Sequence, residues 1–200
     1  MTWPLSVPIP KAKESDRMTS QRIGKYSCLE VECRYLLDKI PGDLPANSEG
    51  WSITDRYFPH TRLRLRHMRS ILGDENIYKL TQKYRSEIQN AYEATVTNTY
   101  LTEAEYRFFE TLEAEILKKR RYAYTVQGHS YDIDVYEGPH GGLILAELEL
   151  EKPEAVGGLV LPSFVLKDVT GDPFFTGGSL AAITDEEFRG GLSGRLGGHD

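Results

Sequence analysis

Hydrophobic and polar residues alternate along much of the chain, as they do in strands that turn one face toward a protein core. The alternation, helped in one segment by β-branched residues, predicts eight strands. They cover residues 27–37, 51–58, 61–68, 77–85, 92–101, 117–126, 131–138 and 142–152. Turn residues such as Gln127-Gly128 join some of these strands over short distances. Short connections favour hairpins, and therefore an antiparallel sheet.

The period changes between residues 102 and 116, where apolar residues recur at the spacing of a helix. These residues are Tyr106, Phe109, Leu112 and Ile116. Thr102 and Glu105 have the spacing of a capping box, in which each side chain binds the backbone N–H of the other residue. We therefore predict a helix over residues 102–116. Two shorter helices are predicted over residues 178–183 and 184–190.

The two ends of the chain differ in composition from its middle. Residues 1–25 contain three prolines and no continuous apolar stretch, so we expect a flexible N-terminal leader. Residues 189–200 are rich in glycine and are expected to form a flexible tail. The folded domain expected between them, residues 26–188, is long enough to bury a substantial core.

Composition argues against several classes of function. The formal net charge of −6 repels phosphate at long range and disfavours binding of duplex nucleic acid. No segment is apolar over the length that a membrane helix needs. Cys28 and Cys33 fall on opposite faces of one predicted strand and cannot form a disulfide there, which fits a reducing cytoplasm. The sequence leaves the oligomeric state open, a homodimer included.

Charged residues occupy every second position in several predicted strands, so each group shares one face. The basic rows are Arg62, Arg64 and Arg66; Lys79 and Lys83; and Lys119 and Arg121. The acidic rows are Glu30 and Glu32; Asp132 and Asp134; and Glu147, Glu149 and Glu151. Arg34 lies on the same face as Glu30 and Glu32.

These rows have two interpretations. An antiparallel sheet often exposes one polar face to water, and charged residues on such a face need no further explanation. Like charges on one face repel each other, however, and here the signs are largely segregated onto different strands. A closed or nearly closed barrel would explain the rows if the basic ones bound an anionic ligand and the acidic ones bound Mg²⁺ or Mn²⁺. A ligand with several phosphates and a bound metal would satisfy both signs.

The order of these motifs resembles the CYTH family, also called the triphosphate tunnel metalloenzymes. The family signature Glu-x-Glu-x-Lys is similar to "EVECR" at residues 30–34. Later motifs of the family are similar to "RLRLR" at 62–66, "KLTQK" at 79–83, "KKRRY" at 118–122 and "GGLILAELEL" at 141–150. The resemblance covers roughly residues 29–182. It implies an α+β fold, in which an antiparallel eight-stranded β-barrel forms a tunnel with helices packed outside.

The resemblance also implies a function and a set of site residues. Family members act on triphosphate compounds with a divalent metal, so we expect metal-dependent hydrolysis of a small-molecule triphosphate or polyphosphate, as by an inorganic triphosphatase. The alternatives are an enzyme of the thiamine triphosphatase or adenylate cyclase type and a non-catalytic protein that binds polyphosphate or a nucleotide. The expected substrate-binding residues are Arg62, Arg64, Arg66, Lys79, Lys83, Lys119 and Arg121. The expected ligands of Mg²⁺ or Mn²⁺ are Glu30, Glu32, Asp134, Glu147 and Glu149, with Arg34 and Glu149 as the catalytic residues. Asp134 has a second expected role, to orient a basic side chain.

The chain departs from the family pattern at two places. Arg34 stands where the signature has lysine, and arginine keeps the charge but cannot act as a base. The segment "TVTNTYL" at residues 95–101 lacks the Arg and Glu that many members carry there. Both departures bear on rate and substrate choice rather than on the fold.

Overall fold

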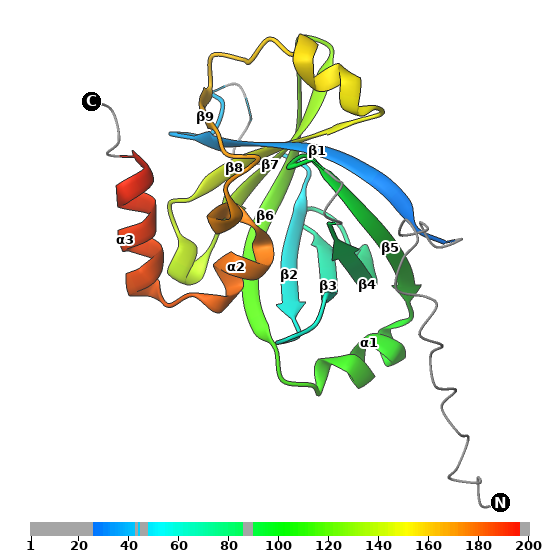
Figure 1. Ribbon diagram of the computed structural model, residues 1–200. Helices are drawn as coiled ribbons and strands as arrows, with labels where there is room; N and C mark the ends of the chain where they lie inside the picture. Colours follow the sequence, from blue (N-terminus) through cyan, green and yellow to red (C-terminus); the bar gives the residue numbers. More distant parts are fainter. Residues whose placement is uncertain (1–25, 43, 45–47, 86–89, 197–200) are drawn as a thin grey trace, which may run out of the picture.

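The computed structural model describes residues 26–42, 44, 48–85 and 90–196 (Figure 1). The expected leader, residues 1–25, lies outside the described residues. Nine strands form one antiparallel sheet, and they include all eight predicted from the sequence. They are β1 (Cys28–Leu37), β2 (Trp51–Tyr57), β3 (Leu63–Ser70), β4 (Asn76–Tyr84), β5 (Glu93–Leu101), β6 (Glu115–Val126), β7 (His129–Tyr136), β8 (Ile144–Leu150) and β9 (Val165–Asp168).

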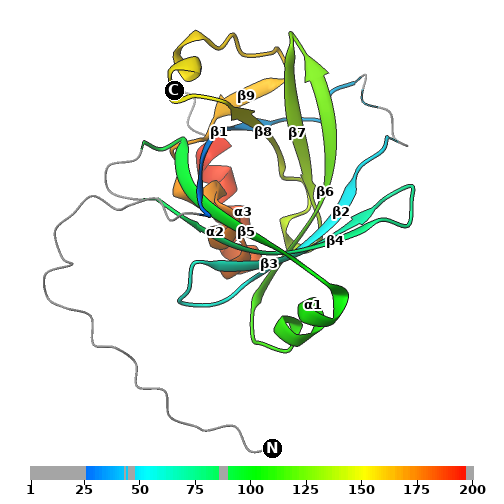
Figure 2. The same cartoon turned by 90° about the vertical axis from the view of Figure 1, so that its right-hand side faces the viewer.

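The sheet closes on itself. Its strand order is β5-β4-β3-β2-β6-β7-β8-β1-β9, and β5 also pairs with β1, so β1 to β8 form a ring. The expected antiparallel eight-stranded barrel is thereby confirmed. Figure 2 looks into this ring, with α2 and α3 behind it.

Strand β1 has three partners, because two strands share one of its edges. Residues 28–31 pair with β5, and residues 35–37 pair with β9. Between the two, the Arg34 N–H donates to Thr170 Oγ1 at 2.9 Å, and the Arg34 carbonyl accepts from the Val169 N–H at 2.9 Å. The sequence did not predict β9, since four residues are too few for alternation to stand out.

The register of the strands decides which residues face inward. Directly opposite residues in an antiparallel ladder share a face. The register pairs Glu32 with Glu149, Arg34 with Glu147, Arg66 with both Asp55 and Lys79, and Arg121 with Asp134. Following these pairs around the ring places both kinds of row on the inner face of one closed barrel.

Helix α1 (Glu103–Glu110) covers the outer face of β3, β4 and β5. Thr102 and Glu105 form the predicted capping box. Tyr106 is buried in a cluster with Phe58 and Leu65, and the partly buried Phe109 packs against that cluster. The predicted helix was too long, because residues 111–114 turn and β6 begins at Glu115. Leu112 and Ile116, which matched the helical spacing, are exposed.

The far end of the barrel interior is filled by the C-terminal part of the chain. Inward-facing Leu36, Leu117 and Leu145 form a buried cluster with residues that follow β9. These later residues include Phe175 of a 3₁₀ turn, η4 (Pro173–Phe175), and Leu180 of α2 (Gly177–Ala182). The interior is therefore apolar at this end and charged elsewhere.

The glycine-rich end of the chain is helical as far as it is described. Helix α3 (Asp185–Leu196) includes residues 189–196 of the segment expected to be a flexible tail, and residues 197–200 of that segment lie outside the described residues. Phe188 anchors the helix, because it is buried and stacks on Phe174 with ring centroids 6.2 Å apart. None of the described helices is both long and apolar enough to cross a membrane.

Candidate functional site

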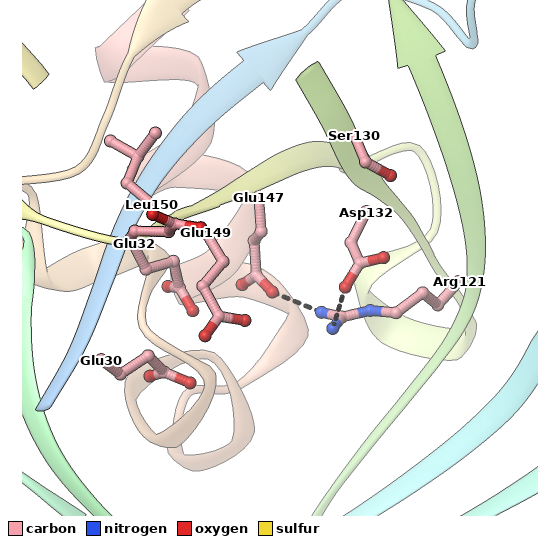
Figure 3. Close-up of a pocket in the computed structure, with 9 residues that line it drawn as sticks. Glu30, Glu32, Arg121, Ser130, Asp132, Glu147, Glu149 and Leu150 are labelled. Carbon is pink, nitrogen blue, oxygen red and sulfur yellow. Dashed lines mark hydrogen bonds and ion pairs between the residues drawn. The ribbon is translucent and has the colours of Figure 1, made fainter. Parts of the chain in front are cut away.

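A cavity of about 460 Å³ opens beside the acidic ends of β1, β7 and β8 (Figure 3). Its lining includes Glu30, Glu32, Asp132, Glu147 and Glu149, together with Arg121. The carboxylates come from three neighbouring strands that alternation turns inward. The predicted acidic rows therefore meet in one place, and Asp132 belongs to that group although it was not among the expected metal ligands.

Arg34, the residue that replaces the signature lysine, lies among these carboxylates. Its side chain is buried and forms ion pairs with Glu32 and with Glu147, the latter with 3.2 Å between Nε and Oε1. Burial alone would lower the pKa of Arg34, but Glu32 and Glu147 hold that pKa above its usual value. Arg34 therefore stays protonated and acts as a fixed positive charge.

Asp134 is completely buried and contacts two cations of the basic rows. It pairs with Lys119, and it accepts from Arg121 Nε at 2.7 Å and from Arg121 Nη2 at 2.6 Å. Arg121 also contacts Asp132, at 2.8 Å, and Glu147. Both oxygens of the Asp134 carboxylate are thus in use. This arrangement suits the orienting role expected for Asp134 better than the role of a metal ligand.

Asp55 is a second buried carboxylate, and the sequence analysis did not select it. It accepts from Arg66 Nε at 2.6 Å and from Arg66 Nη2 at 2.7 Å. Arg64 Nε lies 3.7 Å from Asp55 Oδ1. These contacts with Asp55 fix the direction of both arginine side chains. The only cue in the sequence is a single aspartate between apolar Ile53 and Tyr57 on one strand face.

Lys79 is the inward-facing cation of the basic rows that has the weakest local compensation. Among the described residues, no carboxylate lies within ion-pair distance of it, and its Nζ lies 5.9 Å from the centre of the Tyr100 ring. Burial, together with the positive charges of Arg66 and Arg64, lowers the pKa of Lys79 to about 8. The site therefore holds an ammonium group that an anion would stabilise.

Lys83 and Glu149 occupy the acidic side of the site. The Lys83 ammonium contacts Glu30 and lies 3.3 Å from Glu32 Oε2. Glu149 is exposed, and no ion pair to it is present among the described residues. Burial, and then repulsion from Glu30 and Glu32, raises the pKa of the Glu149 carboxyl. The carboxylates outnumber the cations here.

Among the expected substrate-binding residues, Arg62 alone does not join the inward-facing charged residues of the barrel. It precedes β3, is exposed, and places its guanidinium 4.4 Å from the centre of the Tyr84 ring. At the neighbouring inner positions, Arg64 Nη2 donates to Thr81 Oγ1 at 3.3 Å, and Thr81 Oγ1 lies 2.7 Å from Asn98 Oδ1. Asn98 thus takes an inner position in residues 95–101 of β5, the segment without the expected Arg and Glu.

The carboxylates fit a divalent cation in chemistry but not yet in arrangement. Oxygen ligands suit Mg²⁺ and Mn²⁺, and Glu30 and Glu32 lie close enough to Glu149 to add to the effect of burial in raising its pKa. Within the part of the chain that the structure describes, however, no three His, Cys, Asp or Glu side chains are gathered as a metal-binding group. One physical reason is visible, since Lys83 and Arg34 already contact both oxygens of Glu32.

Known proteins resemble this chain in sequence over part of its length and in fold over most of it. It is 30% identical to an inorganic triphosphatase of Acetivibrio thermocellus over 77 residues, which are 38% of this chain. The match spans 48% of the relative, about half of that curated protein's length. No family model matches the chain.

Two crystal structures of the protein NE1496 share the fold. One, described as the inorganic triphosphatase NE1496, has a TM-score of 0.52 at 20% identity and covers 77% of this chain and 95% of its own. The other, described as a hypothetical protein, has a TM-score of 0.53 at 19% identity and covers 78% of this chain and 99% of its own. At identities this low, the structural likeness establishes a shared barrel fold and nothing more specific.

Proposed function

We propose that this protein binds a compact triphosphate inside its barrel and hydrolyses it with the help of a divalent cation. One observation carries the proposal: the strand register puts the basic and the acidic rows on the same inner face. A wet outer face would not need such segregation, whereas a polyanion with a bound cation needs both signs in one cavity. The partial likeness to an inorganic triphosphatase supports the same reaction.

In this proposal the basic residues bind and orient the phosphates. Arg66, Arg121 and Lys119 are held by the buried carboxylates Asp55 and Asp134, so their positions are set before the ligand arrives. Such preorganised charges stabilise the negative charge of phosphoryl transfer without reorganising during the reaction. The contribution of Lys79 differs in kind, because this ammonium gains its counter-ion only when the phosphate binds.

The acidic residues would hold the cation, and Mg²⁺ or Mn²⁺ fits their oxygen chemistry best. Glu30, Glu32, Glu147 and Glu149 are the proposed ligands. When bound, a divalent cation would offset the negative charge of the phosphates and lower the pKa of water. Arg34 is a proposed catalytic residue through its fixed charge between Glu32 and Glu147, and it is not a base.

A screen for phosphate release tests the function. Purified full-length protein would be incubated with tripolyphosphate, thiamine triphosphate and ATP, each with Mg²⁺, with Mn²⁺ or with EDTA. We expect orthophosphate from tripolyphosphate in the presence of metal only. Pyrophosphate and a cyclic nucleotide from ATP would instead indicate a cyclase. Metal-independent release would contradict the role given to the glutamates.

Binding without turnover is the second candidate, and one observation favours it. Arg34 stands in the place of the signature lysine, and its guanidinium forms ion pairs with two carboxylates. Calorimetry with tripolyphosphate separates the two functions, because tight binding without phosphate release would identify a receptor for polyphosphate or a nucleotide.

A further inference from the structure

Lys83 of β4 contacts residues of a strand that does not pair with β4. It lies on β4 opposite Val96 of β5, and Val96 lies opposite Cys28 of β1. The side chain therefore reaches across the width of β5 to place its ammonium at Glu30 and Glu32 of β1. These two carboxylates belong to the proposed metal ligands.

The ammonium takes the position where a cation is most strongly favoured. Glu32 lies opposite Glu149 in the register, and Glu30 lies on the same inner face. Glu32 offers Oε1 to Arg34 and Oε2 to Lys83, so no oxygen of this residue is left over. Lys83 thus lies between Glu30 and Glu32, and Arg34 lies between Glu32 and Glu147.

Lys79 provides an internal comparison on the same strand. It lies four residues before Lys83, and it also faces inward, opposite Arg66 and Tyr100. Lys79 has cations as its charged neighbours, whereas Lys83 has carboxylates. Two lysines of one row therefore have opposite surroundings, and only Lys83 competes for the proposed metal position.

We propose that Lys83 is a built-in cation that occupies the space between Glu30 and Glu32 until a divalent cation displaces it. The displaced ammonium then turns to the bound phosphates, which supply the negative charge that it loses. This inference rests on the proposed metal-dependent function and adds the residue that couples metal to substrate. Because such coupling is reciprocal, phosphate that captures Lys83 also opens the glutamates to metal.

Removing the competitor must then tighten metal binding, which is the opposite of what damage to the site would do. Mn²⁺ binding to the full-length protein would be measured without any phosphate, from the electron paramagnetic resonance signal of free Mn²⁺. We expect Lys83→Met to bind Mn²⁺ about tenfold more tightly than the wild type, since a full positive charge leaves the site. Lys79→Met is the matched control and should tighten binding by less than about threefold.

Three further variants make the outcomes distinct. Lys83→Arg keeps the charge and should bind Mn²⁺ no more tightly than the wild type. Lys83→Gln gives the same test if the methionine variant is unfolded by circular dichroism. If Mn²⁺ binds the wild type but is not tightened in folded Lys83→Met or Lys83→Gln, this inference is wrong and the proposed function stands. If Glu30→Gln binds Mn²⁺ as well as the wild type, the metal site itself is wrong, and the inference falls with it.

Discussion

Arg66 and Asp55 meet inside the barrel in a two-point ion pair, with both nitrogen–oxygen distances below 2.8 Å. Both side chains are buried, and Asp55 is only 1% exposed. Burial opposes ionisation, but Arg66 and Arg64 hold the pKa of the Asp55 carboxyl below its usual range. Arg64 and Arg66 are therefore kept in place by one carboxylate from the neighbouring strand.

Asp55→Asn should destabilise the fold strongly, because it leaves the buried Arg66 without its counter-charge. We expect a loss of about 3–5 kcal/mol in the free energy of unfolding at pH 7, measured by urea denaturation. The stabilisation by Asp55 is present above the unfolded pKa of about 3.9 and is lost as pH falls toward the lower folded pKa. The variant should therefore lose less stability than the wild type between pH 5 and pH 3.

A matched control uses an ion pair on the surface. Glu103 and Arg107 pair at 3.3 Å on α1, where both side chains are more than half exposed. Glu103→Gln should change the free energy of unfolding little, because water screens such a pair. Equal effects of the two substitutions would show that burial of the Asp55 pair is unimportant.

Lys79→Met should weaken anion binding and change its pH dependence. The pKa of about 8 means that the ammonium of the free protein is lost as pH rises through that value. Tripolyphosphate affinity of the wild type, measured by calorimetry without metal, should therefore fall above about pH 8. The variant should bind more weakly at pH 7 and lose this step, while its unfolding free energy rises because Arg64 and Arg66 no longer repel a third cation. A step that persists in the variant would assign it to another group.

Glu149→Gln should abolish metal-dependent phosphate release and leave the fold intact. Its effect on stability has a definite sign. Because burial and then the neighbouring carboxylates raise the folded pKa of Glu149, its charge costs stability at pH 7, and that cost disappears as pH falls through the raised pKa. In metal-free buffer the variant should be more stable than the wild type at pH 7 and equal to it near pH 4. Glu151→Gln, one step further along the same row, is the control for loss of a nearby charge.

Gly177→Ala should disturb the end of the barrel that α2 fills. A methyl group at Gly177 would overlap the hydroxyl of Tyr57, whereas one at Gly178 would meet the Tyr57 ring at 3.6 Å, an ordinary contact. Both substitutions raise helix propensity equally, so Gly178→Ala corrects for that gain. We expect a lower melting temperature for Gly177→Ala than for Gly178→Ala. The reverse order would mean that Tyr57 moves aside without cost.

Local patterns predicted the barrel well because each strand carries its own alternation. They failed where the decisive contact was distant in sequence. Leu112 and Ile116 fit a helical stripe, yet α1 ends early because the chain must enter β6, whose partner is β2. The glycines of α3 suggested a tail, but Phe188 packs on Phe174 and Arg195 pairs with Asp172, and these contacts hold the helix against the rest of the fold.

For the candidate site, too, local patterns were informative and contacts between residues distant in sequence were not predictable. Period two placed the charged rows on common faces, and the resemblance named most of their members. Which charges pair could not be read from the sequence, since pairing depends on strand register and barrel closure. In the sequence Asp55 is an isolated polar residue, and only the pairing of β2 with β3 shows that it lies opposite Arg66. Arg62 has the spacing of the arginine row, but it does not join that row in the structure, because β3 begins one residue later.

The double partnership of β1 bears on how the protein behaves at high concentration. An unpaired strand edge is a template on which a second chain can assemble, and such edges drive aggregation. Here β5 covers the first part of the edge, β9 covers the last part, and Thr170 and Val169 take the hydrogen bonds of Arg34 between them. Loss of β9 would therefore expose main-chain groups of the same strand that carries Glu32 and Arg34, and would turn this edge into a site of self-association.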